Sequence, residues 1–530
     1  MHEQRPRAAL PSPAEGDESP GKAGSTHERP QAALLLPAEG DELPGKAGST
    51  HERPEAALPP PHEADESPPP LEADVVVVGA GPGGLAAAVA AARGGASVLL
   101  LDAAPLAGGQ IWRARRGLLA DEVARALDAL GVAGARVLPA TRVAFALPER
   151  GLLVEGPEGG RVVRWRRLVL ATGARERLLP FPGWTRPGVF GAGGLQALVK
   201  GGWPIAGRRV VVAGTGPLLL AVAATLRREG ARVVALAEEA SPARLRAFAF
   251  ALLRHPAKAA QALGLVRTLA GVPRHYGARI VAAEGLGATA AEEGAALRRV
   301  IVRSSAGDMP IECDALAAGW GLVPQTELAQ ALGCALVPRF GATAIAVGAR
   351  QRTSVEGVFA VGECTGIAGA RAAALAGTSA GSAAAAELRT AALPAAAALR
   401  TAALPAADEA ALARELHFAG AVARAFTVPP GWRERLAGDT LVCRCEDVRW
   451  DALRAEADLR GAKLATRCGM GHCQGRLCHD ALAQIIGADR LPARPPALAI
   501  GLGALLAIGS ARGAGTVSKQ GSAPPQETEE

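Results

Sequence analysis

The sequence lacks both an export signal and a hydrophobic run long enough to cross a membrane. Its first thirty residues are charged and rich in proline, without the apolar core of a signal peptide. The longest apolar stretch near the C-terminus, residues 497–508, has about a dozen residues, whereas a membrane helix needs roughly twenty. We therefore expect a cytoplasmic protein with no membrane span.

Aromatic residues are also scarce. They make up 3% of the chain, and no run of basic residues alternates with them. The formal net charge is +7, although the first 70 residues carry 13 acidic and only 6 basic side chains. This distribution argues against a nucleic-acid partner. A basic surface beyond the acidic N-terminus suits anionic cofactors or an acidic redox partner.

Common catalytic arrangements are missing as well. Cys313, Cys334 and Cys364 each stand alone in the sequence, so the redox-active cysteine pair of a disulfide reductase is absent. No Ser-His-Asp set and no pair of carboxylates stands out. We predict no catalytic residue and expect the chemistry to be that of bound cofactors.

The chain is long enough for several domains, because 530 residues exceed what a single core accommodates. Residues 1–70 hold three imperfect copies of a unit of about 25 residues rich in Pro, Glu, Gly and Ser, which predicts a disordered arm. A pattern of strand, glycine turn, helix and strand begins at residue 74 and returns at residue 209. This alternation predicts two doubly wound parallel α/β sheets.

The first of these turns carries a dinucleotide-binding fingerprint. Gly79, Gly81 and Gly84 form G-x-G-x-x-G directly after an apolar strand and before an alanine-rich helix. These glycines allow the tight turn, the close approach of a pyrophosphate and the packing of helix on strand. The helix N-terminus offers free N–H groups to the phosphates. Asp102 ends the next strand, where its carboxylate can accept hydrogen bonds from a ribose, so we predict a dinucleotide site.

The second turn departs from the fingerprint. Gly214 and Gly216 are in place and Glu238 ends the following strand, but Leu219 replaces the third glycine. A leucine there pushes the helix away from the strand. Two interpretations stay open. One is a site for NAD or another adenine nucleotide, with Glu238 disfavouring the 2′-phosphate of NADP; the other is a vestigial site kept for packing.

Cysteines cluster near the C-terminus. Cys443 and Cys445 form C-x-C, and Cys473 and Cys478 form C-x4-C, so that two short loops offer four thiolates. This set indicates a [2Fe–2S] cluster, because zinc sites more usually show C-x2-C knuckles. Structural zinc is the alternative. Cys468 is a fifth thiol, surplus to a four-ligand count.

Further segments resemble the two-dinucleotide-binding flavoprotein fold. LVLATGARE (168–176) runs a strand into a Thr-Gly turn, and TSVEGVFAVGECTGIAGA (353–370) holds Gly-Glu where that fold has Gly-Asp or Gly-Glu. The resemblance implies that the first site binds FAD. The contacts expected for FAD are Gly79, Gly81, Gly84, Asp102, Gly109, Gln110, Thr172, Gly173, Gly362 and Glu363.

A narrower resemblance rests on GGQIWR (108–113), on residues 171–202 and 319–334, and on RCGMGHCQGRLC (467–478). These segments are similar to the FAD- and NAD-binding alpha-type subunits of multi-subunit dehydrogenases for opines, hydroxyproline, proline and glycine. The hydrogen cyanide synthase B subunit belongs to this family. The cysteine motifs resemble the bacterioferritin-associated-ferredoxin-like [2Fe–2S] domain.

The family resemblance implies a function and partners. The chain would be the electron-transfer subunit of a heteromeric amino-acid, opine or amine dehydrogenase. Its expected partners are an amino-acid-oxidase-like flavoprotein subunit and a small ferredoxin-like subunit. One alternative is a self-contained NADH-dependent reductase that passes electrons through its cluster, and another is a non-enzymatic iron-sensing or assembly module.

The predicted fold is therefore a two-dinucleotide-binding flavoprotein with two Rossmann-like α/β domains and a small C-terminal [2Fe–2S] domain. The predicted boundaries are a disordered arm (1–70), the FAD-binding domain in two parts (71–190 and 319–388), an NAD-binding-like domain (191–318), a linker (389–410), the [2Fe–2S] domain (411–496) and a tail (497–530).

Overall fold

The computed structural model describes residues 69–285, 296–390, 404–428, 431–487, 500–501 and 504–505. All of them belong to one compact unit, residues 64–530. Most of the predicted arm, linker and tail lies outside the described residues. Where the predicted linker is described again, it enters helix α10 (Ala406–Ala425). No described helix combines the length and apolar character required to cross a membrane.

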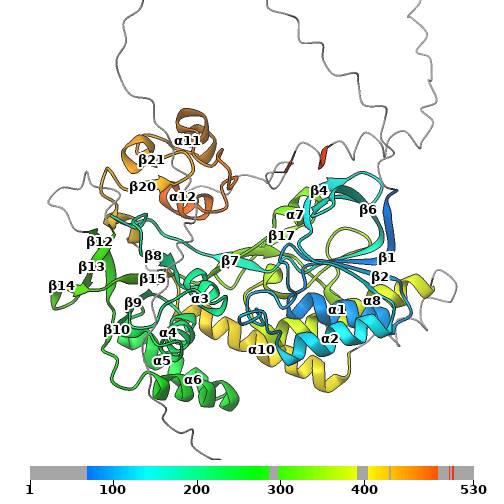
Figure 1. Cartoon of the computed structure of the whole chain (residues 1–530), viewed down its shortest axis with the longest axis horizontal. Helices are drawn as coiled ribbons and strands as arrows, with labels where there is room; N and C mark the ends of the chain where they lie inside the picture. The colour runs from blue at the N-terminus through cyan, green and yellow to red at the C-terminus, as the bar shows by residue number, and fades with distance from the viewer. Residues whose placement is uncertain are drawn as a thin grey trace, which may run out of the picture. The chain divides into compact units, whose positions relative to one another are not determined.

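The first part of the fold is a seven-stranded sheet (Figure 1). Its elements are β1 (Leu71–Val78), α1 (Pro82–Arg93), β2 (Val98–Leu101), α2 (Asp121–Val132), β3 (Arg136–Leu138), β4 (Arg142–Leu147), β5 (Gly151–Gly156), β6 (Gly159–Leu170) and, from later in the chain, β19 (Val358–Ala360). The order is β3-β2-β1-β6-β5-β4, with β19 beside the end of β6. The strands β3, β2, β1 and β19 run parallel to β6, whereas β4 and β5 extend it in antiparallel pairing.

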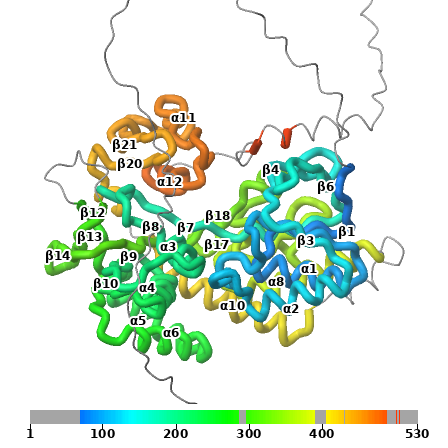
Figure 2. Tube along the Cα trace, viewed as in Figure 1, coloured from blue at the N-terminus to red at the C-terminus, as the bar shows by residue number. Residues whose placement is uncertain are grey.

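Small residues hold two helices against each other beneath this sheet. Helix α1 and helix α8 (Ala370–Thr390) lie side by side (Figure 1 and Figure 2) and are in direct contact. A methyl group on Gly377 or Gly381 would collide with the backbone carbonyls of Gly83 and Ala87. The alanine- and glycine-rich sequence therefore allows the two helix backbones to touch.

A second, five-stranded sheet follows, with the order β11-β10-β9-β15-β8 and parallel pairing throughout. Its elements, with a three-stranded antiparallel sheet inserted before β15, are β8 (Val189–Gly191), α3 (Ala192–Lys200), β9 (Arg209–Gly214), α4 (Leu218–Arg228), β10 (Arg232–Glu238), α5 (Pro242–Leu252), α6 (Pro256–Thr268), β11 (Arg274–Tyr276), β12 (Arg279–Gly285), β13 (Leu297–Ser304), β14 (Gly307–Glu312) and β15 (Ala315–Gly319). The second sheet is parallel as the sequence predicts, whereas the first is mixed, because β4 and β5 pair in antiparallel register.

Short elements connect the two sheets in both directions and lead to α8. They are β7 (Ala174–Glu176), β16 (Leu322–Pro324), α7 (Glu327–Ala331), β17 (Leu336–Arg339), β18 (Ala342–Ile345), η1 (Ala349–Gln351) and η2 (Gly362–Thr365). Strand β7 pairs with β16 in antiparallel register and carries the chain from the first sheet toward the second.

The C-terminal region is small and shares its core with the second sheet. It comprises η3 (Trp432–Arg435), β20 (Leu441–Cys443), β21 (Val448–Arg449), η4 (Trp450–Leu453), α11 (Leu459–Thr466) and α12 (His479–Ile486). One continuous cluster of buried side chains runs from Val211 through Trp320 and Trp432 to Cys478. The cysteine region is therefore packed on the second sheet by apolar contacts.

Candidate cofactor sites

The three glycines of the first fingerprint have different structural roles. Methyl groups on Gly79 and Gly84 would collide with the carbonyl oxygens of Ala171 and Gly79, so close packing requires glycine at both positions. A methyl group on Gly81 would meet no atom closer than 3.9 Å, and its φ of −76° suits any residue. The packing of the chain does not require glycine at position 81, which fits space reserved for a ligand.

The surroundings of Gly81 suit an anion. It is the N-cap of α1 and provides no side-chain cap, which leaves N–H groups of the first turn available to phosphate. Asp102, at the end of β2, is partly exposed and accepts a 2.7 Å hydrogen bond from the Ala104 N–H. A second hydrogen bond, from the Ala80 N–H, ties the same carboxylate to the glycine loop.

The Gly109–Gln110 segment lies against this loop. The Gly108 N–H donates to the Ala80 carbonyl at 2.8 Å. Gly109 has a φ of +59°, and a methyl group there would come within 2.9 Å of the Gly81 Cα. The exposed Gln110 accepts a hydrogen bond from Arg113 at 3.3 Å.

Two more predicted segments meet at the same edge of the sheet. Strands β6 and β19 pair in parallel, so the turns that follow them, Thr172–Gly173 and Gly362–Glu363, are neighbours. The Thr172 hydroxyl donates to the Gln325 carbonyl at 2.8 Å, and the Gln325 amide donates back to the Thr172 carbonyl at 2.8 Å. The carboxyl edge of a parallel sheet is where this fold binds its ligands.

Glu363 has an unsatisfied carboxylate oxygen. Its Oε1 accepts a hydrogen bond from the Gly369 N–H at 2.9 Å, but its Oε2 is buried without a partner among the described residues. Burial raises the pKa of Glu363 to about 7. A buried acceptor normally has a donor, so this oxygen fits a ligand hydroxyl such as those of the ribityl chain of FAD.

The second glycine loop differs in how its helix begins. Gly214 and Gly216 have φ values of +132° and +121°, which favour glycine. Helix α4 begins at Leu218, after an N-cap at Pro217, whereas α1 begins directly after Gly81. Leu219, only 1% exposed, fills the space where the first loop has a glycine.

Glu238 is bound by its own loop. Its carboxylate accepts hydrogen bonds from the Thr215 hydroxyl at 2.6 Å, the Gly216 N–H at 3.0 Å and the Ala240 N–H at 2.8 Å. It is 5% exposed, and burial raises its pKa. Its burial against the loop leaves little room for a ribose hydroxyl to approach the carboxylate.

The neighbouring Glu239 joins this loop to the cysteine region, a contact that the sequence did not reveal. Arg435 binds it with two hydrogen bonds of 2.8 and 2.7 Å, and both side chains are almost fully buried. The Trp320 indole N–H also donates to Glu239, at 2.9 Å.

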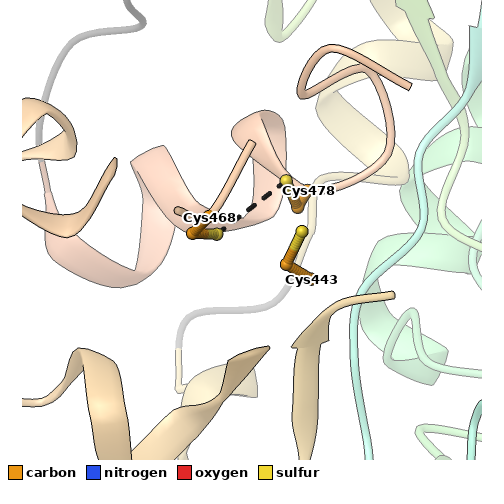
Figure 3. Close-up of side chains that lie close together, drawn as sticks. All are labelled: Cys443, Cys468 and Cys478. Atoms are coloured by element: carbon orange, nitrogen blue, oxygen red, sulfur yellow. Dashed lines mark hydrogen bonds between the residues drawn. The ribbon is translucent and has the colours of Figure 1, made fainter. Parts of the chain in front are cut away.

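Three cysteine sulfurs lie together in the C-terminal region. The sulfurs of Cys443, Cys468 and Cys478 are all within 4.8 Å of one another, and all three residues are buried (Figure 3). Hydrogen bonds from Cys468 and Cys478 lower the pKa of Cys443 to about 2. Cys445, which is exposed, and Cys473, which is partly exposed, form a hydrogen-bonded pair of their own.

In this arrangement each of the five thiols of the region lies near at least one other. Of the four predicted ligands, Cys443 and Cys478 meet each other and Cys445 meets Cys473, while Cys468 joins the first pair. The four-ligand assignment stays a prediction. The sequence does carry a signal for Cys468, because Cys468, Cys473 and Cys478 repeat the C-x4-C spacing.

Strand β7 connects the two groups of residues, which the sequence also did not reveal. It follows the Thr-Gly turn directly, and successive side chains point to opposite sides. Arg175 donates to the Arg476 carbonyl at 3.0 Å, and Arg177 binds Asp480 at 2.8 Å with both side chains 12% exposed. Glu176 points the other way, to the backbone at the start of α3, and burial raises its pKa.

Comparison with known proteins gives a consistent result. Residues 73–387 match the family described as pyridine nucleotide-disulphide oxidoreductase. Hydrogen cyanide synthase subunit HcnB of Pseudomonas protegens is 33% identical over 444 residues, which cover 78% of this chain and 92% of the relative. The A subunit of opine oxidase from Rhizobium meliloti is 32% identical over 477 residues, covering 81% and 97%.

A solved structure supports the fold. The crystal structure of L-proline dehydrogenase from P. horikoshii superimposes with a TM-score of 0.58 at 20% identity. The match covers 82% of this chain and 79% of that one. At this identity the likeness establishes the α/β dinucleotide-binding flavoprotein fold.

Proposed function

This chain belongs to the pyridine nucleotide-disulphide oxidoreductase family, and from that premise we propose that it is the electron-transfer subunit of a heteromeric dehydrogenase for amino acids, opines or related amines. It is a flavin oxidoreductase, and its relatives from hydrogen cyanide synthase and opine oxidase are named as subunits. The finer parts of the proposal concern its cofactors, its partner and its donor.

The first site is proposed to hold FAD, which when bound supplies hydride-accepting and one-electron chemistry. Gly81 and the start of α1 would receive the pyrophosphate, Asp102 the adenine ribose, and Glu363 the ribityl chain. Gly109, Gln110, Thr172, Gly173 and Gly362 complete the proposed contacts, together with Gly79 and Gly84, which shape the loop. The open space at Gly81 and the unpartnered Glu363 Oε2 support this proposal.

The C-terminal cysteines are proposed to hold a [2Fe–2S] cluster, a one-electron carrier. The proposed ligands are Cys443, Cys445, Cys473 and Cys478. The buried group of Cys443, Cys468 and Cys478 supports a metal site in this region; it contains two of the four proposed ligands together with Cys468. Structural zinc remains the alternative at this site.

The observation that carries the electron-transfer proposal is the path of β7. Within four residues of Gly173, the chain leaves the proposed flavin edge. Arg175 then binds the Arg476 carbonyl and Arg177 binds the Asp480 carboxylate, both in the cysteine region. Ion pairs as buried as Arg177–Asp480 are costly to break, because removing one partner leaves an uncompensated charge. The strand therefore holds the two proposed cofactor sites in a fixed relation.

The second loop is proposed to have a packing role rather than to oxidise NADH. Its acid, Glu238, is already satisfied by Thr215, Gly216 and Ala240. Its neighbour Glu239 binds Arg435 of the cysteine region. These contacts disfavour a self-contained NADH-dependent reductase, although an adenine nucleotide held by other groups is compatible with them.

The proposed partner is an amino-acid-oxidase-like flavoprotein subunit that oxidises the donor, with a small ferredoxin-like subunit as a further component. The test is a dye-reduction assay with proline, hydroxyproline, sarcosine and an opine. The pure chain should turn over slowly with each donor, and adding the oxidase-like protein encoded beside it should raise the rate on one of them. Robust turnover by the isolated chain would overturn the relay proposal.

Two matched cysteine variants separate the cluster from the rest of the proposal. Wild-type protein should contain flavin and about two irons per chain with little zinc. Cys473→Ser should keep flavin but lose iron, and adding the oxidase-like partner should no longer raise its dye-reduction rate. Cys468→Ser should keep the flavin, the iron and the rate increase. Equal iron loss in both variants would refute the four-ligand assignment, and stoichiometric zinc without iron would refute the cluster.

A further inference from the structure

A hollow of about 670 Å³ has none of the proposed FAD or cluster residues in its lining. One wall is the segment of residues 111–120, which follows the Gly109–Gln110 turn. The other is formed by the ends of α3 and α4, including Val199, Thr225 and Arg228. Its volume is within the range of small-molecule pockets, about 300–1,000 Å³.

Positive charge dominates this hollow. Its lining contains five basic side chains and one carboxylate, namely Arg113, Arg115, Arg116, Lys200, Arg228 and Glu229. Glu229 pairs with Arg115 and lies 3.6 Å from Arg116. The other three basic residues have no acidic partner among the described residues, so the hollow carries excess positive charge.

Two of these cations are poorly satisfied by the protein. The Nε of Arg113 is buried and has no hydrogen-bond partner among the described residues. Within the same part of the chain, Lys200 reaches only the Ile111 carbonyl, at 3.5 Å. Burial, followed by repulsion from Arg115 and Arg113, lowers the pKa of Lys200. Holding the two partly buried charges of Arg113 and Lys200 close together is unfavourable, and a bound anion would offset that cost.

Apolar groups complete the lining. Ile111 is 59% exposed and Leu118 is 77% exposed, unusually high for large apolar side chains. Trp112 and Val199 line the same space. We propose that this hollow binds an organic anion that carries two or more negative charges, as phosphate or carboxylate groups, on an apolar body.

The ligand would bridge the two halves of the fold. Residues 111–120 belong to the connection between β2 and α2 of the first sheet, and α3 and α4 pack on the second. The polar contacts that cross the hollow include Arg115–Glu229 and the Arg116 N–H to the Lys200 carbonyl at 2.9 Å. An anion bound to both walls would add further contacts of this kind and should therefore raise the melting temperature of the chain.

The test is calorimetric titration of the full chain at low ionic strength with two probes, inorganic pyrophosphate and citrate. One site per chain is expected, and the better probe identifies phosphate or carboxylate as the preferred group. The double variant Lys200→Gln/Arg228→Gln should bind at least about tenfold more weakly, because it removes two charge-assisted contacts. Arg246→Gln, an exposed arginine on α5 outside the hollow, is the matched control and should bind like wild type.

A charge change of the opposite sign sharpens the test. Glu229→Gln removes the one carboxylate of the lining and frees Arg115, so it should bind the probe several-fold more tightly. Lys200→Arg keeps the charge and should retain binding, which separates loss of charge from loss of folding. Melting curves without ligand check that each variant is folded.

Three results would overturn the proposal. One is that wild type binds neither probe. Another is that Arg246→Gln loses as much affinity as the double variant, which would indicate nonspecific attraction to a basic surface. The third is that a poly-glutamate peptide binds the hollow while pyrophosphate and citrate do not, which would make it a docking surface for an acidic protein segment.

Discussion

The acid that follows the first glycine loop is partly exposed, whereas the acid that follows the second loop is buried against that loop. Asp102 is partly exposed and accepts hydrogen bonds from backbone N–H groups, and nearby Glu363 has a buried oxygen without a partner in the described structure. Glu238 is buried and accepts a side-chain hydroxyl as well as two N–H groups. The two loops share strand, turn, helix and acid, and both acids accept backbone N–H groups, but Asp102 is partly exposed whereas Glu238 is buried.

The comparison shows that a glycine fingerprint predicts the position of a loop but not whether that loop binds a nucleotide. Leu219 stands where the first loop has glycine and is buried, and α4 begins two residues after the second glycine of its loop, whereas α1 begins one residue after. The acid then faces its own loop, and the next residue, Glu239, holds the cysteine region through Arg435. These contacts are the basis for the proposal that the second loop has a packing role.

The largest effect is expected at the first loop. Gly81→Val should yield protein without flavin, because the side chain enters the space that the packing leaves open for pyrophosphate. Flavin absorbance per chain after purification is the measurement. Gly131→Val, in the exposed part of α2, is the control and should retain flavin. Stoichiometric flavin in Gly81→Val would show that the two loops have been assigned the wrong way round.

A large loss of stability, rather than of ligand, is expected at the second loop. Leu219→Ala should lower the free energy of unfolding by about 2–5 kcal/mol, since it empties a fully packed position. The urea midpoint measures the loss, and Leu218→Ala, at the half-buried neighbour, should lose less. NADH affinity should not improve. Tight NADH binding by Leu219→Ala would mean that the leucine alone closes the site.

At Glu363 the comparison can be tested through the pH dependence of the stability of the flavin-free chain. Burial raises its pKa from 4.5 to about 7, so its uncharged form is the one favoured by folding. Its contribution to the stability of the flavin-free chain is therefore complete below about pH 4.5 and is lost as the pH rises through about 7, a loss of at most about 3 kcal/mol.

Melting temperatures of the flavin-free chain between about pH 5 and pH 8 measure this effect. Glu363→Gln should flatten the profile, whereas Glu356→Gln, whose side chain is 90% exposed, should not. Bound FAD should flatten it too, because hydroxyl donors to Oε2 favour the carboxylate. An unchanged profile with FAD would place the ribityl chain elsewhere.

Much of this structure follows from local sequence signals, and the remainder depends on long-range packing. The strand, glycine turn and helix at Gly79–Gly84 can be predicted because each step is encoded within a few residues. The partners of Glu238 could not be, since whether a carboxylate faces a ribose or Thr215 depends on how α4 packs. The contacts of Arg177 with Asp480 and of Arg435 with Glu239 join residues far apart in sequence, and no spacing rule indicates them.

The smallest expected effect tests the Thr215–Glu238 contact, on which the contrast between the loops depends. Thr215→Val replaces the hydroxyl that donates to Glu238 with a methyl group of nearly the same size. The carboxylate keeps the N–H groups of Gly216 and Ala240, so the loss should be only about 1–2 kcal/mol. Because this hydroxyl lowers the pKa of Glu238 against the effect of burial, the pKa should rise further in the variant.

The stability of Thr215→Val should consequently fall more steeply than that of wild type as the pH rises through the pKa of Glu238. Thr268→Val is the control, since its hydroxyl bonds the Gly264 carbonyl of its own helix and its loss should cost little. NADH titration of the same variants distinguishes a loop that only packs against the rest of the chain from a loop that can bind NADH. If the loop only has a packing role, the Glu238 oxygen that loses its hydroxyl donor stays buried and NADH does not bind. If Thr215→Val instead keeps its stability and binds NADH, the hydroxyl was occupying the place of a ribose, and the two loops differ by one exchangeable hydrogen bond.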